Sequence, residues 1–264
     1  MEINLVFILS IKLLSLGLIV KSLEFLYTIN DFSEKSIFSW KIIGTDYLLH
    51  SKLNIFFKYI YSKNGMKILA VITIILSCSL LVFNSNYKGY NFILSVLLTI
   101  NILYYLRQIY GVDGADQMLF LITIVLLLCY LIFNTIAIKK TGATFIAIQL
   151  LLSYFVAGIA KLVSNSWRSG SAIKGILSTN TYGSKFTRDI LTKKNRINKA
   201  ICWMVILIEI AFPVIIFIPH EYIFYFLGLG FILHLSIAII MGLNDFIWGF
   251  IAAYPFLYYV CLNI

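Results

Sequence analysis

Eight long apolar runs divide the chain, and they restrict its fold more than any other feature. They cover residues 3–21, 66–85, 90–110, 117–138, 143–163, 197–219, 222–242 and 245–263. A helix of roughly 20 apolar residues crosses a bilayer core, so each run is long enough for one crossing. The chain is 61% hydrophobic and only 12% charged, a balance that leaves too little polar surface for a soluble exterior. We therefore predict an all-α, polytopic integral membrane bundle with about eight transmembrane helices, forming a single domain over residues 1–264 without a soluble domain.

One short segment between the runs has the pattern of an amphipathic helix. In "KLNIFFKYIY" one helical face carries only apolar residues, whereas Asn54 and Lys58 lie elsewhere. The residues of that face are Leu53, Phe56, Phe57 and Ile60. The pattern predicts a helix lying in the membrane interface. An amphipathic helix packed on the bundle is the alternative.

The two long connections, 22–65 and 164–199, contain most of the basic residues. The second connection carries one acid, Asp189, against Arg168, Lys174, Lys185, Arg188, Lys193, Lys194, Arg196 and Lys199. With eight spans both connections lie on one side, and the positive-inside rule places that side in the cytoplasm. The net charge of +10 thus reflects membrane topology, and we expect the lipid bilayer as a partner and no nucleic acid.

Two ionisable residues lie deep inside apolar runs, where a functional role is the first hypothesis. His234 is near the middle of its run, and an imidazole suits proton transfer. The alternative is a histidine that only bonds a neighbouring helix. Glu209 precedes Pro213 by four residues, so the proline is expected to kink the helix at the carboxylate. This carboxylate either binds a proton or cation, pairs with a basic side chain, or accepts a structural hydrogen bond.

Lys161 ends the apolar run "TFIAIQLLLSYFVAGIA", two residues before a polar loop. By position alone it is expected to extend its ammonium to the interface. Tyr154 and Gly158 precede it with helical spacing, however, so the three residues share one face. Gly158 leaves space beside the lysine for a flat ligand or a second helix. Desolvation there would favour a neutral amine, which could act as a base.

The remaining polar candidates have ordinary structural explanations. Asp113 and Asp116 stand at the start of the fourth run, where acidic residues commonly cap a helix. Arg107, near the end of the third run, is expected to be an interfacial anchor. The four cysteines, Cys78, Cys129, Cys202 and Cys261, have no metal-like spacing, so we expect buried thiols and no metal site.

Two stretches resemble the HTTM domain, the membrane portion of vitamin K-dependent γ-glutamyl carboxylases and their bacterial relatives. The first is "SYFVAGIAKLVSNSWRSG", with its aromatic pair, Ala-Gly step, lysine, and later Trp and Gly. The second is "HLSIAIIMGLNDFIWGFIAAYPF", in which His234, Phe246 and Pro255 follow the family spacing. With a looser match at "NYKGYNFILSVLLTINILYYL", the resemblance covers residues 66–263.

The resemblance implies a reaction and a set of site residues. The family lysine that matches Lys161 is the base that deprotonates vitamin K hydroquinone, and the histidine that matches His234 belongs to the same pocket. A quinone or hydroquinone is then the expected cofactor, with Tyr154, Gly158 and Trp167 as the residues that contact it. Asp116 stands where the carboxylases have a catalytic histidine, so the resemblance implies that it takes part in proton transfer with Lys161 and His234. A carboxylate in place of the imidazole weighs against glutamate carboxylation itself.

Among the bacterial relatives, "GADQM" and "WRSGSAIKGILSTNTYG" are most similar to small SdpB-type proteins, which occur with secreted antimicrobial peptides. This similarity implies a multi-pass protein of the bacterial cytoplasmic membrane that matures a secreted peptide, with the precursor and an accessory maturation protein as partners. A non-catalytic peptide exporter, an accessory subunit or an immunity protein is the alternative. The carboxylases hold their active site on the lumenal side, whereas the charge count places the long connections inside, so the orientation stays open.

Overall fold

In the computed structural model, the described residues are 1–36, 38–47, 53–83, 89–107, 113–131, 134–179, 182 and 195–264. Within these ranges seven helices are long and apolar enough to cross a membrane, and no strand occurs. The helices are α1 (Ile3–Tyr27), α4 (Lys63–Val82), α5 (Tyr90–Arg107), α6 (Gly114–Leu131), α7 (Ile136–Val163), α11 (Asn195–Ala211) with the 3₁₀ helix η2 (Phe212–Phe217), and η3 (His220–Tyr222) with α12 (Ile223–Met241). The predicted all-α, multi-pass membrane bundle is therefore confirmed.

The eighth apolar run differs from the single span that its length predicts. It forms two short helices, α13 (Asp245–Ile251) and α14 (Tyr254–Cys261), joined at Ala252 and Ala253. Pro255 lies in the first turn of α14. Because proline has no N–H to bond the preceding turn, it favours a new helix start at this point. α13 packs against α1, α6 and α12, while α14 packs against α1 and α7.

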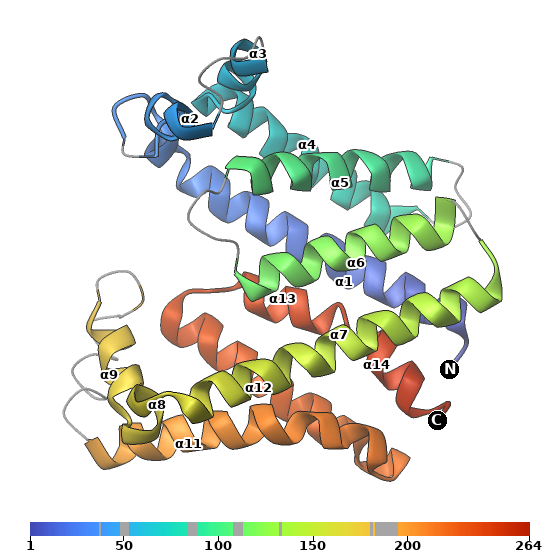
Figure 1. The fold of residues 1–264 in the computed structure, drawn as a ribbon. Helices are drawn as coiled ribbons and strands as arrows, with labels where there is room; N and C mark the ends of the chain where they lie inside the picture. The colour runs from blue at the N-terminus through green and yellow to red at the C-terminus, as the bar shows by residue number, and fades with distance from the viewer. Residues whose placement is uncertain are drawn as a thin grey trace.

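The long helices give the bundle two ends, and the connections are unevenly shared between them (Figure 1). The N- and C-termini lie at one end. At the other end lie the short helices α2 (Trp40–Tyr47), α3 (Leu53–Ile60), α8 (Asn165–Ser169) and α9 (Ser171–Ser178). This arrangement agrees with the prediction that both long connections lie on one side. The charged residues Lys185, Arg188, Asp189, Lys193 and Lys194 of the second connection lie outside the described residues.

The predicted amphipathic helix is present as α3. Phe57 and Ile60 pack against a buried cluster that includes Trp40 and Tyr61, whereas Phe56 is 58% exposed. The Phe57 ring stacks on Tyr61 with 5.3 Å between ring centroids. One side of α3 therefore packs on the bundle. Its location in the membrane interface stays a prediction.

The main core lies between α1, α6, α7, α12 and the C-terminal pair of short helices. Phe7 meets Phe256 edge to face at 5.2 Å, and the Ser10 hydroxyl donates to the carbonyl of Ala252 at 2.7 Å. These contacts hold the C-terminal helices against α1. Cys129, Cys202 and Cys261 are buried as predicted, whereas Cys78 is exposed, because it lies on the outward face of α4 with Ile75 and Val82.

Candidate functional site

Lys161 and Glu209 form a close ion pair between α7 and α11. The ammonium Nζ is 2.6 Å from Oε2 and 2.8 Å from Oε1 of Glu209, so both carboxylate oxygens accept from it. The lysine side chain is 20% exposed and the glutamate side chain 9%. Of the roles predicted for the Glu209 carboxylate, the structure shows pairing with a basic side chain. The geometry is that of an ion pair rather than an isolated amine.

Gly158, one turn before Lys161, allows this close approach of the two helices. A Cβ atom at Gly158 would lie 2.7 Å from Cγ1 and 2.9 Å from the backbone N of Ile210, next to Glu209. The space beside Gly158 is therefore taken by a second helix, which is the alternative to a flat ligand. The predicted shared face of Tyr154, Gly158 and Lys161 is confirmed, because all three contact residues of α11 or η2.

Pro213 ends the regular part of the helix that carries Glu209. The α-helical part stops at Ala211 and continues as the 3₁₀ helix η2, with the proline in its first turn. The proline cannot donate the backbone hydrogen bond that would continue the α-helix. The kink expected from the sequence thus takes the form of a change in helix type two residues after Glu209.

Trp167 lies beside Lys161 although it belongs to the next helix, α8. The lysine Nζ is 5.2 Å from the centroid of the Trp167 ring, a distance at which a cation is attracted to an aromatic face. The structure therefore brings together Lys161 and all three residues predicted around it.

A second polar group lies deeper in the bundle and is centred on Tyr154. Its hydroxyl is 2.8 Å from Nε2 of His234 and 3.0 Å from the hydroxyl of Tyr254. The three side chains come from α7, α12 and α14, and they are only 2%, 4% and 9% exposed, respectively. They form a buried hydrogen-bonded chain, Tyr254–Tyr154–His234.

His234 has one hydrogen-bonding atom left over. Its Nδ1 is buried and has no partner. The imidazole stacks on Phe250 at 3.9 Å and lies 6.2 Å from the Phe246 ring centroid. Because buried polar atoms are normally bonded, this nitrogen is available to a further polar group.

The two polar groups are near enough to influence one another electrostatically. The charge of Lys161 acts on His234, and the charge of Glu209 acts on Tyr154. α7 packs against both α11 and α14, and it contributes Lys161 to the first group and Tyr154 to the second, so a single helix carries a member of each group. We refer to Lys161, Glu209, Tyr154, His234 and Tyr254 as the intramembrane polar site.

Asp116 belongs to a separate cluster at the end of the bundle where α6 begins. It forms an ion pair with Lys21 of α1. Carboxylate oxygens of Asp113, Asp116 and Asp245 all lie within 4.8 Å of one another. Asp113 accepts from the backbone N–H of Asp116 at 2.8 Å, so the predicted capping role is confirmed for Asp113. Lys21 supplies positive charge at this acidic cluster.

Burial and mutual repulsion disturb the carboxylates of this cluster that lie outside the spans. Burial, followed by the charges of Asp113 and Asp116, raises the pKa of Asp245 to about 6. Burial also raises the pKa of Asp113 above its ordinary value. The acidic cluster therefore holds a proton more readily than isolated aspartates do.

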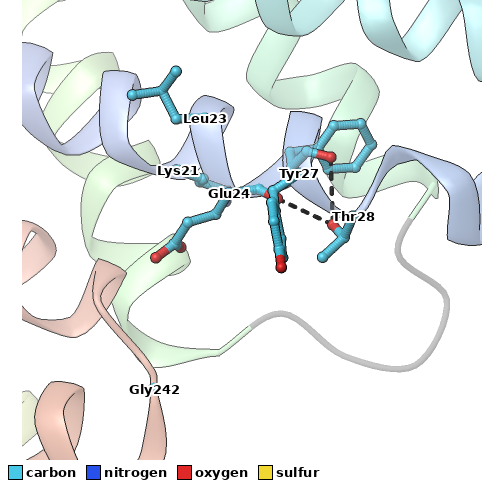
Figure 2. Close-up of a pocket in the computed structure, with 7 residues that line it drawn as sticks. Lys21, Leu23, Glu24, Tyr27, Thr28 and Gly242 are labelled. Carbon is cyan, nitrogen blue, oxygen red and sulfur yellow. Dashed lines mark hydrogen bonds between the residues drawn. The ribbon is translucent and has the colours of Figure 1, made fainter.

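An open groove of about 620 Å³ adjoins the acidic cluster (Figure 2). It is lined by Lys21, Leu23, Glu24, Phe25, Tyr27, Thr28 and Gly242. Glu24 accepts a hydrogen bond from the side-chain amide of Asn244, which joins the end of α1 to the turn between α12 and α13. Polar side chains thus continue from the groove through Lys21 to Asp116.

The helix α13 separates Asp116 from the intramembrane polar site. Its first residue, Asp245, lies at the acidic cluster, and its Phe246 and Phe250 lie against His234. No hydrogen bond between described residues joins Asp116 to His234. The structure therefore brings together Lys161, His234, Tyr154, Gly158, Trp167 and Glu209, and places Asp116 on the far side of α13.

Three residues of these clusters were not found from the sequence. Tyr254 and Lys21 sit in apolar runs, and Asp245 stands at the start of one, where each has an ordinary explanation. The one available signal for Tyr254 was its position beside Pro255, where a helix must restart. Their roles depend on contacts between segments far apart in the chain, which periodicity does not reveal.

No protein-family model, curated protein or solved structure matches this chain. The resemblance to the HTTM family stays a prediction.

Proposed function

We propose that the protein is a multi-pass membrane enzyme of the HTTM type that transfers protons at the intramembrane polar site while a secreted peptide is matured. The observation that most supports this proposal is that ionisable and hydroxyl side chains from α7, α11, α12 and α14 are hydrogen-bonded to partners on neighbouring helices inside the bundle. Side chains that only anchor helices at the membrane interface would not be expected to contact one another. Ionisable groups at this depth are rare unless they serve a purpose.

The residues have distinct parts in this proposal. Glu209 holds the Lys161 ammonium, and the proton shared by the pair can leave through either carboxylate oxygen. Tyr154 links His234 to Tyr254, so a proton can move along three bonded groups in a region without bulk water. Trp167 stabilises the charged lysine from the side of the loop.

The chemistry of the site suits a quinone-type cofactor in one respect. The imidazole of His234 carries an unpartnered Nδ1 and stacks on Phe250 near Phe246, a combination that matches an aromatic ring carrying oxygen atoms. His234 and these two phenylalanines would hold the group. When bound, a quinone would supply two-electron oxidation and reduction.

The peptide substrate comes from the resemblance to SdpB-type proteins, and the net charge of +10 is compatible with an acidic or neutral precursor. To test the proposal, the protein is expressed in a host that makes the candidate precursor peptide and the accessory maturation protein. The mass of the secreted peptide is then compared with and without the membrane protein. We expect a mass difference that disappears in Lys161→Met and His234→Gln.

Lys140→Met is the matched control, because Lys140 lies on the same helix as Lys161 but is exposed and outside the polar site. It should retain the mass difference. An unchanged peptide mass in the presence of wild-type protein would contradict the proposed enzyme. Loss of modification in the control as well would show a folding or charge effect instead of a role of the polar site.

The alternative is a non-catalytic exporter, accessory subunit or immunity protein. The same ion pair also agrees with this alternative. Because both carboxylate oxygens of Glu209 are occupied by Lys161, the pair can serve purely to join α7 to α11. Peptide release without covalent change in proteoliposomes would support an exporter. Protection of a sensitive host by the Lys161→Met variant would support an immunity protein.

A further inference from the structure

Arg107 is folded into the protein instead of anchoring α5 at the interface. The residue is only 4% exposed, which contradicts the role expected from its position at the end of an apolar run. Its Nη2 donates to the backbone carbonyl of Phe38 at 2.7 Å. The guanidinium also lies 4.4 Å from the centroid of the Phe32 ring. These two contacts draw the side chain toward the segment before α2.

The charge of Arg107 has no acidic counterpart. No carboxylate among the described residues forms an ion pair with it. A guanidinium has five N–H donors in a planar fork, yet Nη2 alone has a hydrogen-bond acceptor here and Nε is buried without one. Burying a charge without a paired charge is strongly unfavourable. The buried guanidinium therefore has donors that can still bind an acceptor.

Three further donors near Arg107 are also buried and unpartnered. They are the Ser39 hydroxyl, the Trp40 indole N–H and the Tyr104 hydroxyl, on residues that are 1%, 8% and 9% exposed. Ser39 follows the residue whose carbonyl binds Arg107, and Tyr104 lies one turn before Arg107 on the same face of α5. Trp40 and Tyr104 belong to one buried cluster. Buried donors without partners are uncommon, and these four come from the last turn of α5 and from the residues that begin α2.

We propose that Arg107, Ser39, Trp40 and Tyr104 bind the phosphate group of an anionic membrane lipid. A phosphate offers only acceptor oxygens, which match a set of groups that can all donate, and arginine binds phosphate through two parallel hydrogen bonds. In this structure the Phe32 ring covers the guanidinium, and the phosphate would replace that ring.

The position of the site favours a lipid over a free phosphate ion. Arg107 is the last residue of a membrane-spanning helix, at the depth where headgroups lie. The segment before α2 offers acyl chains an apolar surface next to the site. Phe38, whose carbonyl binds Arg107, is itself 42% exposed.

The test uses full-length protein purified in detergent and freed of lipid. Phosphatidylglycerol or phosphatidylcholine is added. The number of lipid molecules bound per protein is measured by native mass spectrometry, and the melting temperature of the protein is recorded. We expect phosphatidylglycerol to bind more tightly than phosphatidylcholine and to raise the melting temperature more, because the choline ammonium offsets the phosphate charge of phosphatidylcholine. In Arg107→Gln the dissociation constant for phosphatidylglycerol should rise about tenfold or more, because charge-assisted hydrogen bonds are lost.

Arg168→Gln is the matched control, since Arg168 lies at the same end of the bundle but is exposed on α8. It removes the same charge and should leave lipid binding unchanged. Equal loss of binding in the two variants would overturn the proposal. Inorganic phosphate is the second arm: if it alone raises the melting temperature and displaces phosphatidylglycerol, the ligand is free phosphate and the lipid assignment fails.

Tyr104→Phe keeps the proposal testable if Arg107→Gln does not fold. It removes only a hydroxyl that has no partner in this structure, so the lipid-free protein should melt at the same or a higher temperature than wild type. The same variant should bind phosphatidylglycerol more weakly. Unchanged affinity in Tyr104→Phe would exclude the hydroxyl from the site and contradict the proposed donor set.

Discussion

The Lys161 ammonium donates to both carboxylate oxygens of Glu209, and this pair joins the end of α7 to the middle of the α11–η2 span. Its side chains are mostly shielded, with 20% and 9% of their surfaces exposed. Removal of one partner therefore leaves the other charge in a poorly solvated position, whereas removal of both leaves no uncompensated charge.

We predict that Lys161→Met and Glu209→Gln each lower the free energy of unfolding by about 2–3 kcal/mol. The double variant Lys161→Met/Glu209→Gln should recover a large part of this loss. Denaturation of the purified proteins in detergent measures all three variants. Losses that simply add in the double variant would contradict an energetic coupling between the two residues.

The Tyr154 hydroxyl is the centre of the Tyr254–Tyr154–His234 chain, and this gives two tyrosine variants different expected effects. Tyr154→Phe leaves both Nε2 of His234 and the hydroxyl of Tyr254 without a partner, whereas Tyr254→Phe leaves the bond between Tyr154 and His234 in place. We expect Tyr154→Phe to be the more destabilising by about 1 kcal/mol or more, since it leaves two buried polar groups unpaired and Tyr254→Phe leaves none. Equal melting temperatures would show that the chain is not formed in solution.

Much of the fold could be predicted from the apolar runs and from helical spacing. Run length identified the seven spans, and the i, i+4, i+7 spacing placed Tyr154, Gly158 and Lys161 on one face. Pro213 predicts a kink, and at this position the structure has a change from α-helix to 3₁₀ helix. These features are local, because each depends on residues within a few turns of one another.

The partners of the polar residues could not be predicted in the same way. Arg107 occupies a position typical of an interfacial anchor, and only the segment before α2 folds over it. Lys21 and Asp116 come from different helices, and nothing in either sequence segment indicates the other. Such contacts depend on how the helices pack against one another. This packing depends on the side chains of all the helices together and cannot be read from a single apolar run.

The pKa of Asp245, raised to about 6, predicts a pH-dependent stability. A carboxyl whose pKa is higher in the folded state favours folding when protonated, so this contribution is present below about pH 4 and is lost as the pH rises through about 6. The groups that face it are Asp113, Asp116 and Lys21. Asp245→Asn should flatten the melting-temperature profile between pH 4 and 7 and stabilise the protein at neutral pH. A profile parallel to that of wild type would contradict the raised pKa.

Two glycines on α12 provide a matched test of the packing around the polar site. A Cβ atom at Gly230 would lie 2.5 Å from the hydroxyl oxygen of Tyr254 and 2.8 Å from that of Tyr154, whereas a Cβ at Gly228 would meet nothing within 4 Å. Gly230→Ala must therefore displace the two hydroxyls that form the chain to His234, and we expect a loss of about 1–3 kcal/mol in stability.

Gly228→Ala makes the same chemical change two residues away, and it should be neutral or stabilising by up to about 1 kcal/mol because alanine is the better helix former. Melting temperatures in detergent compare the two variants directly. If the polar site also acts in peptide maturation, the modified peptide should decrease only in Gly230→Ala. Equal stability of the two variants would mean that α12 does not press against Tyr154 and Tyr254 as the structure shows.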